Sequence, residues 1–173
     1  MTLILFTSLN PVEGQKEVTE FDDPLGRYNL TYPSDWKLHY DNNYDIILLP
    51  IDNNSKDSYT YFQIRSTLPY NISLKDHVFR NINYYIDRYA IGDFILFSIN
   101  NLIDNITIDE LPAYKLEYDV IMNDKFQTPV SILEYFIAHN NNLFKIKFSQ
   151  GGYGINSLNK NILDSIIRSI EFK

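Results

Sequence analysis

Residues 21–36, FDDPLGRYNLTYPSDW, carry the clearest structural pattern in the sequence and mark the start of the folded domain. Their DPLG segment, residues 23–26, is typical of a tight turn, because proline presets φ and glycine tolerates a positive φ. From Tyr28 to Tyr32, apolar and polar residues alternate with the period of a half-buried strand. A Pro-Ser-Asp break follows, and Trp36 then brings a large apolar surface back toward the core. The stretch therefore predicts a turn, a strand and a second turn at the start of the folded domain.

Composition limits the class of protein. With 173 residues, of which 45% are hydrophobic and 15% aromatic, the chain is long enough for one domain with a sizeable core. Its formal net charge of −7 argues against binding to nucleic acid or to anionic lipid, which both need basic surfaces. The absence of cysteine excludes disulfides, thiolate catalysis and cysteine-ligated metal sites.

The first 20 residues differ from the domain that follows, which we assign to residues 21–173. Residues 3–9 are mostly apolar but too few to span a bilayer, and they resemble the late part of a secretory signal peptide. Val12 and Gly14 then precede Gln15 at positions where signal peptidase prefers small residues. No basic residue precedes this segment, so a complete signal peptide is not visible. We expect residues 1–20 to be a leader or tail of an exported, extracytoplasmic protein; an N-terminal strand or a frayed tail is the alternative.

Hydrophobic periodicity predicts strands, a helix, a run of strands and a second helix. Short polar segments at residues 123–125 and 140–142 indicate hairpins and therefore antiparallel pairing. The sequence thus predicts an α+β fold, an α/β/α sandwich with a central antiparallel sheet flanked by helices. The expected strands cover residues 28–32, 36–40, 44–51, 59–68, 94–100, 106–110, 113–122, 128–139 and 143–149, and the expected helices cover residues 73–89 and about 158–170.

Two of these elements carry specific predictions about which face is buried. In the first helix, Ser73 and Asp76 form a capping-box pattern, and the apolar positions are Leu74, Val78, Ile82, Ile86 and Tyr89. In the strand over residues 59–68, Phe62, Ile64 and Leu68 are expected to share the buried face with Ser66. Gln63, Arg65 and Thr67 are expected to face water.

Three groups of residues resemble the PsbP-like domain family, and together they span residues 21–173. The opening runs from Phe21 through a polar turn and glycine to a strand that ends Tyr32-Pro33, followed by Trp36. Residues 111–116, LPAYKL, are similar to the entry of the family's central strand. Residues 144–149, FKIKFS, and residues 163–172, LDSIIRSIEF, resemble its close.

The resemblance implies an α/β/α sandwich around an antiparallel sheet. PsbP proteins are extrinsic, non-enzymatic subunits on the lumenal side of photosystem II, where they help to retain calcium and chloride. Related domains occur in exported or lipid-anchored proteins of bacteria and archaea, and a nuclear-transport factor that binds the GTPase Ran shares the fold. The resemblance implies no functional residue for this chain, because its matching motifs are structural.

The candidate metal ligands show weak patterns. His39, His77 and His139 fall in separate predicted elements and have no ligand spacing among themselves. Asp41, Asn43 and Asp45 alternate as in a calcium loop, but the glycine and the bidentate glutamate of the helix–loop–helix pattern are missing. Calcium or zinc binding is therefore only a low expectation, and the identity of any metal ligand is unknown from the sequence.

Other motifs also have simple structural explanations. The GGYG segment at residues 151–154 precedes a helix but lacks the full phosphate-binding fingerprint. The acid pairs Asp22/Asp23 and Asp109/Glu110 are adjacent, so in strands their members point to opposite faces. Neither a nucleophile elbow nor a zinc-protease motif occurs. Sequons for N-glycosylation begin at Asn29, Asn53, Asn71 and Asn105 and are compatible with export.

From these patterns we expect a non-catalytic exported binding or accessory protein that associates with a membrane or cell-surface protein complex. It is expected to be a monomer that binds neither nucleic acid nor the bilayer interior. The alternative is a carrier of a small ligand or metal ion, calcium or zinc, in a cleft between sheet and helix. No catalytic or cofactor-binding residue is assigned.

Overall fold

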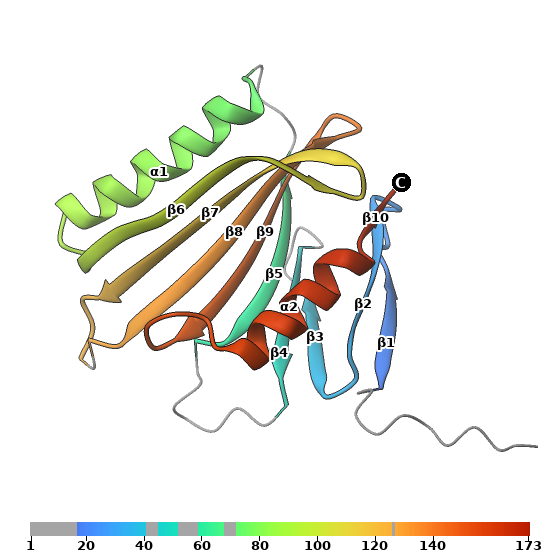
Figure 1. The fold of residues 1–173 in the computed structure, drawn as a ribbon, viewed down its shortest axis with the longest axis horizontal. Helices are drawn as coiled ribbons and strands as arrows, with labels where there is room; N and C mark the ends of the chain where they lie inside the picture. Colours follow the sequence, from blue (N-terminus) through green and yellow to red (C-terminus); the bar gives the residue numbers. More distant parts are fainter. Residues whose placement is uncertain (1–16, 41–44, 52–58, 68–71, 126) are drawn as a thin grey trace, which may run out of the picture.

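The computed structural model describes residues 17–40, 45–51, 59–67, 72–125 and 127–173 (Figure 1). Within these residues the chain forms ten strands and two helices, and nearly all of them match elements that the sequence predicts. The elements in chain order are β1 (Val18–Asp22), β2 (Tyr28–Pro33), β3 (Trp36–Tyr40), β4 (Ile46–Pro50), β5 (Tyr61–Thr67), α1 (Leu74–Ala90), β6 (Phe94–Ile108), β7 (Leu111–Met122), β8 (Pro129–His139), β9 (Asn142–Gly151), α2 (Ser157–Ser169) and β10 (Glu171–Phe172).

The described strands form two antiparallel sheets. The large sheet has seven strands in the order β3-β4-β5-β9-β8-β7-β6, and the small sheet has three in the order β1-β2-β10. The predicted α+β class with antiparallel pairing is therefore confirmed. Pro33 ends β2 in the small sheet and Trp36 begins β3 in the large one, so the predicted second turn carries the chain between the sheets.

The opening turn is fixed by a buried ion pair. The Asp23 carboxylate, whose side chain has no exposed surface, accepts hydrogen bonds from Arg27 Nε at 2.8 Å, Nη2 at 2.7 Å and the backbone N–H at 3.0 Å. The same pair raises the pKa of Arg27, chiefly through the hydrogen bond to Asp23. Past the turn, Tyr28, Leu30 and Tyr32 are buried, as the alternating pattern predicts.

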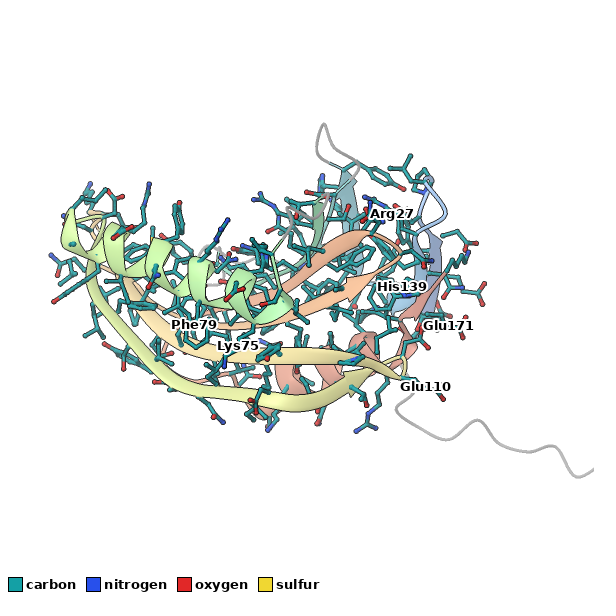
Figure 2. All side chains as sticks on the ribbon, turned by 90° about the horizontal axis from the view of Figure 1, so that it is seen from above. Arg27, Lys75, Phe79, Glu110, His139 and Glu171 are labelled. Atoms are coloured by element: carbon teal, nitrogen blue, oxygen red, sulfur yellow. The ribbon has the colours of Figure 1, made fainter. Side chains whose placement is uncertain are left out.

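Two groups of apolar side chains form the core, one on each face of the large sheet. Figure 1 shows α1 over one face and α2 over the other. On one face, α1 packs against β6 and β8 through a core that includes Val78, Ile82 and Phe136. On the other face, α2 and the small sheet pack together, so a three-stranded sheet shares this layer with the helix. Figure 2 shows Phe79 on α1, far from His139 at the end where β10 lies.

Helix α1 begins as predicted but is rotated relative to the predicted buried face. Ser73 Oγ accepts a hydrogen bond from the Asp76 backbone N–H at 3.1 Å, so Ser73 is confirmed as the N-cap. The buried residues include Tyr85, whereas Ile86 and Tyr89, which we predicted to be buried, are about half exposed (46% and 50%). The reason is that Tyr85 turns inward to reach a buried carboxylate on β8, described below.

Strand β6 corrects another prediction, because the segments 94–100 and 106–110 form one strand up to Ile108. Three register shifts in its pairing with β7 interrupt the alternation of side chains, which made the sequence look like two strands. Asp109 and Glu110 then form the turn, with φ of 49° and 61°.

At the other end of the chain, β1 begins at Val18 and pairs with β2, so residues 18–20 of the predicted leader lie in the small sheet.

The small sheet joins distant parts of the sequence. Strand β10 pairs with β2 through Glu171 opposite Asn29 and Phe172 opposite Tyr28. The Lys173 backbone N–H extends the pairing to the Arg27 carbonyl at 3.0 Å. The residues that close the fold therefore lie beside the residues that open it.

Candidate functional site

A cleft lies between α1 and the face of the large sheet that the helix covers only in part. Its volume of about 420 Å³ lies within the range of about 300–1,000 Å³ that is usual for small-ligand sites. Its floor comes from β5, β9, β8 and β7, and its roof comes from the last turns of α1. We call it the α1 cleft; the described residues that line it are Tyr59, Tyr61, Gln63, Arg65, Tyr84, Tyr85, Arg88, Phe94, Tyr118, Val120, Met122, Val130, Ile132, Lys145, Lys147 and Ser149.

Strand register gathers cations on the floor of the α1 cleft. Arg65 on β5 stands directly opposite Lys145 on β9, and Lys147 follows two residues further along the same face. Like charges placed directly opposite each other on neighbouring strands destabilise a sheet. This arrangement therefore needs compensation by an anion.

One buried carboxylate supplies part of that compensation. Glu134 on β8 has no exposed surface, and its Oε1 accepts a hydrogen bond from the Tyr85 hydroxyl at 2.7 Å. Lys145 Nζ lies 3.8 Å from the same Oε1 and donates to Asn81 Oδ1 at 3.4 Å. Within the described part of the chain, the other oxygen, Oε2, and the buried hydroxyl of Tyr118 have no hydrogen-bond partner.

The remaining cations of the cleft differ in their partners. Arg88 Nε pairs with Asp93 at 2.5 Å and is thereby neutralised. Arg65 has an amide partner, because the Gln63 side-chain oxygen, in the orientation that satisfies both groups, accepts from its Nε at 2.9 Å. Lys147 Nζ lies 5.7 Å from the centre of the Tyr61 ring, within cation–π range.

The balance of charge in the α1 cleft is positive. None of the described lining residues is a carboxylate. The acid in contact with the cations of the floor is Glu134, while Asp124 lies at the edge, where it accepts a hydrogen bond from Tyr59 at 2.8 Å. Three cations, at positions 65, 145 and 147, face the Glu134 carboxylate, which leaves a net charge of +2. That local excess stands out in a protein whose formal net charge is −7.

Burial and charge shift the titration of groups in and beside the cleft. Burial lowers the pKa of the Lys145 ammonium, and the nearby Lys147 and Arg65 lower it further, while Glu134 opposes them. Burial also raises the pKa values of Tyr85 and Tyr118, as does the neighbouring Glu134. The charge of Glu134 therefore shifts the pKa of Lys145, Tyr85 and Tyr118, so these four groups are electrostatically coupled.

The sequence did not reveal this site, and its prediction for β5 was wrong about Gln63. We expected Gln63, Arg65 and Thr67 to face water. Arg65 and Thr67 are exposed as predicted, but Gln63 is buried, and Gln63 and Arg65 line the α1 cleft. A polar strand face that lines a cleft has the same pattern as one that faces bulk water. One signal was available in the nearly continuous apolar run of β8, where Glu134 is the one charged residue before His139.

The residues selected from the sequence do not assemble into a site. His39 is exposed on β3, His77 lies on α1, and His139 ends β8. Asp45 is buried and accepts from the Ser66 backbone N–H at 3.0 Å, while Asp41 and Asn43 lie outside the described residues. Among the residues that the structure describes, no group of three or more His, Cys, Asp or Glu could hold a metal ion.

The other predicted motifs have structural partners. In the GGYG segment, the Gly154 N–H donates to Ser131 Oγ at 2.6 Å, which fixes the loop before α2. Asp22 is exposed and pairs with Lys173, while the carboxylate of Asp109 accepts from the Phe172 backbone N–H at 2.7 Å. The sequons at Asn53 and Asn71 lie outside the described residues.

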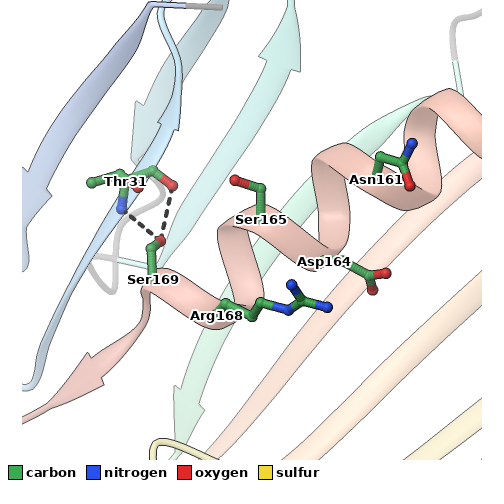
Figure 3. A pocket seen from close by; sticks show the side chains of 6 residues that line it. All are labelled: Thr31, Asn161, Asp164, Ser165, Arg168 and Ser169. Atoms are coloured by element: carbon green, nitrogen blue, oxygen red, sulfur yellow. Dashed lines mark hydrogen bonds between the residues drawn. The ribbon is translucent and has the colours of Figure 1, made fainter. Parts of the chain in front are cut away.

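A second hollow lies between α2 and β2, and it is polar and shallow (Figure 3). Ser169 Oγ accepts from the Thr31 N–H at 2.9 Å and donates to the Thr31 carbonyl at 3.2 Å, so these residues tie the helix to the small sheet. Asp164 and Arg168 line its outer side on the helix surface. Because it holds no buried charge, we regard the α1 cleft as the candidate functional site.

Comparisons with known proteins identify the fold. No protein-family model and no curated protein sequence matches this chain. Among solved structures, cyanobacterial PsbP (CyanoP) from Synechocystis is similar, with a TM-score of 0.66 over 97% of this chain and 99% of that chain at 16% identity. The chain therefore has the PsbP fold that its sequence motifs resemble.

Two further solved structures share this fold at still lower identity. The Ran-binding protein Mog1p of Saccharomyces cerevisiae has a TM-score of 0.62 at 6% identity, over 91% of this chain and 96% of that chain. LpqN of Mycobacterium tuberculosis, which is involved in cell envelope biogenesis, has a TM-score of 0.51 at 11% identity over 91% of both chains. At such identities the likeness concerns the fold alone.

Proposed function

We propose that this chain is a non-catalytic binding protein that carries a small anionic ligand in the α1 cleft. The observation that carries the proposal is the placement of Arg65 opposite Lys145, with Lys147 beside them and one carboxylate for all three. An anion bound there would relieve the repulsion between the cations, and the partial burial of Lys145 and Lys147 would strengthen their contacts with it.

A metal ion or a catalytic reaction has less support. Excess positive charge disfavours a calcium or zinc ion as cargo in the α1 cleft, since these cations need oxygen or histidine ligands. A buried cluster of ionisable groups also occurs in enzymes. Here, however, Glu134 contacts both Tyr85 and Lys145, and the lining hydroxyls that donate to carboxylates belong to tyrosines, Tyr85 to Glu134 and Tyr59 to Asp124.

The test is titration of the purified protein with inorganic phosphate, followed by calorimetry and by NMR shifts of amides on β5 and β9. We expect Lys147→Gln to weaken phosphate binding about tenfold, since a charged hydrogen bond contributes about 1.5–3 kcal/mol. Lys160→Gln is the matched control, because Lys160 is exposed on α2. Equal affinities for both variants, or no saturable shift at all, would refute the proposal.

A second candidate function, binding of a protein partner, is favoured by exposed apolar side chains on α1 and β6. β6 is an edge strand with β7 as its one neighbour in the sheet. The exposed side chains, which we call the α1–β6 apolar surface, are Phe79, Ile86, Tyr89, Ile91, Ile95, Ile99 and Leu102. Clustered apolar exposure of this kind marks sites of protein association.

Site-specific cross-linking in the host organism tests this second candidate. A photoreactive group at Ile99 should give one discrete cross-linked product, which the added substitution Phe79→Ser should abolish. The same group at Lys160 on α2 should give none. Cross-linking that is equal at both positions would argue against a specific partner. The partner that we propose is a protein complex at a membrane or cell surface.

We further infer that residues 1 to about 14 are a leader and that the mature protein works outside the cytoplasm. The apolar run at residues 3–9 supports this, as does the likeness to LpqN, whose described role lies in the cell envelope. Among the described residues, no helix is long and apolar enough to cross a membrane. The intact mass of the protein from its own host tests the inference: a start near Gln15 supports export, and a retained Met1 contradicts it.

A further inference from the structure

We propose that the anion carried in the α1 cleft is a phosphate monoester with an apolar body. This inference rests on the proposed function and goes beyond it by naming the chemical class of the ligand. It follows from two halves of the same cleft floor, one charged and one apolar, which lie next to each other along β9.

The charged half fits a headgroup with two negative charges. Its three cations and single carboxylate leave a charge of +2, which a phosphate monoester, with a second pKa of about 6, would neutralise at neutral pH. A carboxylate would neutralise half of it. The Nε and Nη2 groups of Arg65 donate to Gln63 at 2.9 and 3.1 Å, so its remaining Nη N–H groups are the ones that suit phosphate oxygens, while Lys147 supplies a point charge.

The apolar half continues directly from the charged half. Ser149 follows Lys147 by two residues on β9, which is about 7 Å along the strand. It lies opposite Ile132 on β8. Ile132 in turn is paired with Tyr118, and Val130 with Val120 on β7. Phe94 and Met122 complete this apolar floor, which no described charged side chain crosses.

Most of this floor is already buried, but Phe94 and Met122 are half-buried, and a ligand that is polar throughout would leave them facing water. An uncharged apolar ligand would leave the cations uncompensated. Both halves are satisfied only by a molecule that is charged at one end and apolar along the rest. An alkyl or an aryl ester of phosphate has this character, and the two kinds of body can be compared directly.

The test is a calorimetric series at pH 8 with inorganic phosphate, methyl phosphate, butyl phosphate, hexyl phosphate and phenyl phosphate. We expect affinity to rise by about two- to fourfold for each methylene that enters the cleft, as expected for burial of apolar surface. Hexanoate also has six carbons but carries one negative charge, so it should bind at least tenfold more weakly than hexyl phosphate. Binding of hexyl phosphate should also weaken as the pH falls below about 6.

Two variants separate the halves of the site. Met122→Gln, at the half-buried rim of the apolar floor, should lower the affinity for hexyl phosphate and reduce the gain from methyl to hexyl phosphate. Leu158→Gln, at an exposed position of α2, is the matched control and should change neither.

The outcomes distinguish the two proposals. Equal binding of methyl and hexyl phosphate, with loss of both in Lys147→Gln, would overturn the apolar body and leave the anion site intact. Equal binding of hexanoate and hexyl phosphate would overturn the phosphate headgroup. If no member of the series binds, the anion site itself is refuted, and the ligand class with it. If phenyl phosphate binds better than hexyl phosphate, the apolar body is confirmed as aromatic.

Discussion

At the scale of single residues, Glu134 controls the charge of the α1 cleft. Replacing it by glutamine keeps an acceptor for the Tyr85 hydroxyl but removes the counter-charge of Lys145. We expect phosphate affinity to increase at least tenfold, because each negative charge of the phosphate, at about 10 Å, is repelled by about 1.7 kcal/mol at an effective dielectric constant of about 20. The pKa of Lys145, already lowered by burial, should fall further and can be followed by NMR.

The control for Glu134→Gln is Glu117→Gln. Glu117 lies on β7 and pairs loosely with Lys115 at 3.9 Å, outside the cleft lining. It removes the same formal charge from the protein, so it should leave phosphate affinity within about twofold of the wild type. If both variants strengthen binding equally, the effect belongs to the net charge of the whole molecule.

A second prediction concerns the turn at the start of the domain. Asp23→Ala removes a fully buried carboxylate from a largely buried Arg27, so it should destabilise the protein by about 3–5 kcal/mol in urea unfolding. The neighbouring Asp22→Ala breaks an exposed ion pair with Lys173 and should have little effect. Similar stabilities for the two variants would contradict the structural role of the Asp23–Arg27 pair.

Alternation in the sequence was enough to predict the buried residues of β2, but it could not assign every polar residue. Tyr28, Leu30 and Tyr32 are buried as predicted, because both the turn before them and the break after them fix the register. Gln63 was wrongly predicted to face water, and the cleft beside Arg65 was missed, because period-2 polarity does not show what lies across from a strand. That information comes from α1 and β9, which are far away in the sequence.

At the scale of elements, α1 forms the roof of the cleft, and its first turn depends on Ser73. Ser73→Ala removes the hydrogen bond that the Asp76 N–H donates and should cost about 1 kcal/mol of stability. Amide exchange should increase first in the opening turn of α1. The same substitution at Ser34, in an exposed turn between β2 and β3, should leave α1 exchange unchanged. Unchanged exchange in both variants would contradict the cap.

The ends of the helices were predictable, but their rotation was not. Capping residues and apolar periodicity locate α1 to within about one residue at each end. Ile86 and Tyr85 are adjacent and both suit a buried position, so the sequence alone did not choose between them. The hydrogen bond from Tyr85 to Glu134, 49 residues away, makes the choice. Similarly, the bulges of β6 hid a single long strand from a period-2 search.

At the scale of the whole molecule, buried tyrosines limit stability at high pH. Burial raises the pKa of Tyr135 to about 12 and raises those of Tyr28, Tyr85 and Tyr118 even further from their ordinary value of 10. Above pH 10, unfolded tyrosines release protons that the folded ones retain. Stability therefore falls, by about 1.4 kcal/mol per pH unit for each group and about 5 for the four together. The lowered pKa of Lys145 acts in the opposite sense only up to its ordinary value of 10.5.

We therefore expect cooperative unfolding between about pH 10 and 12, since domains of this size have about 5–15 kcal/mol to lose. Circular dichroism and tyrosinate absorbance should change together. Tyr28→Phe is the matched variant: its hydroxyl is buried without a partner among the described residues, so its removal should stabilise the protein and shift unfolding to higher pH. Gradual ionisation with intact sheet signal would show that these tyrosines are reached by solvent.

The pairing of β10 with β2 has a consequence for the way the protein is made. The ribosome synthesises residues 28 and 29 long before their strand partners, residues 171 and 172, because more than 140 positions separate the two pairs. Until those last partners emerge, the β1–β2 hairpin lacks one edge strand, and an isolated hairpin is marginally stable at best. A ribosome-stalled chain that ends before residue 170 should therefore remain sensitive to protease throughout the small sheet. Closure of the small sheet therefore waits until residues 171 and 172 have left the ribosome, and it depends on contacts of high sequence separation, which form slowly.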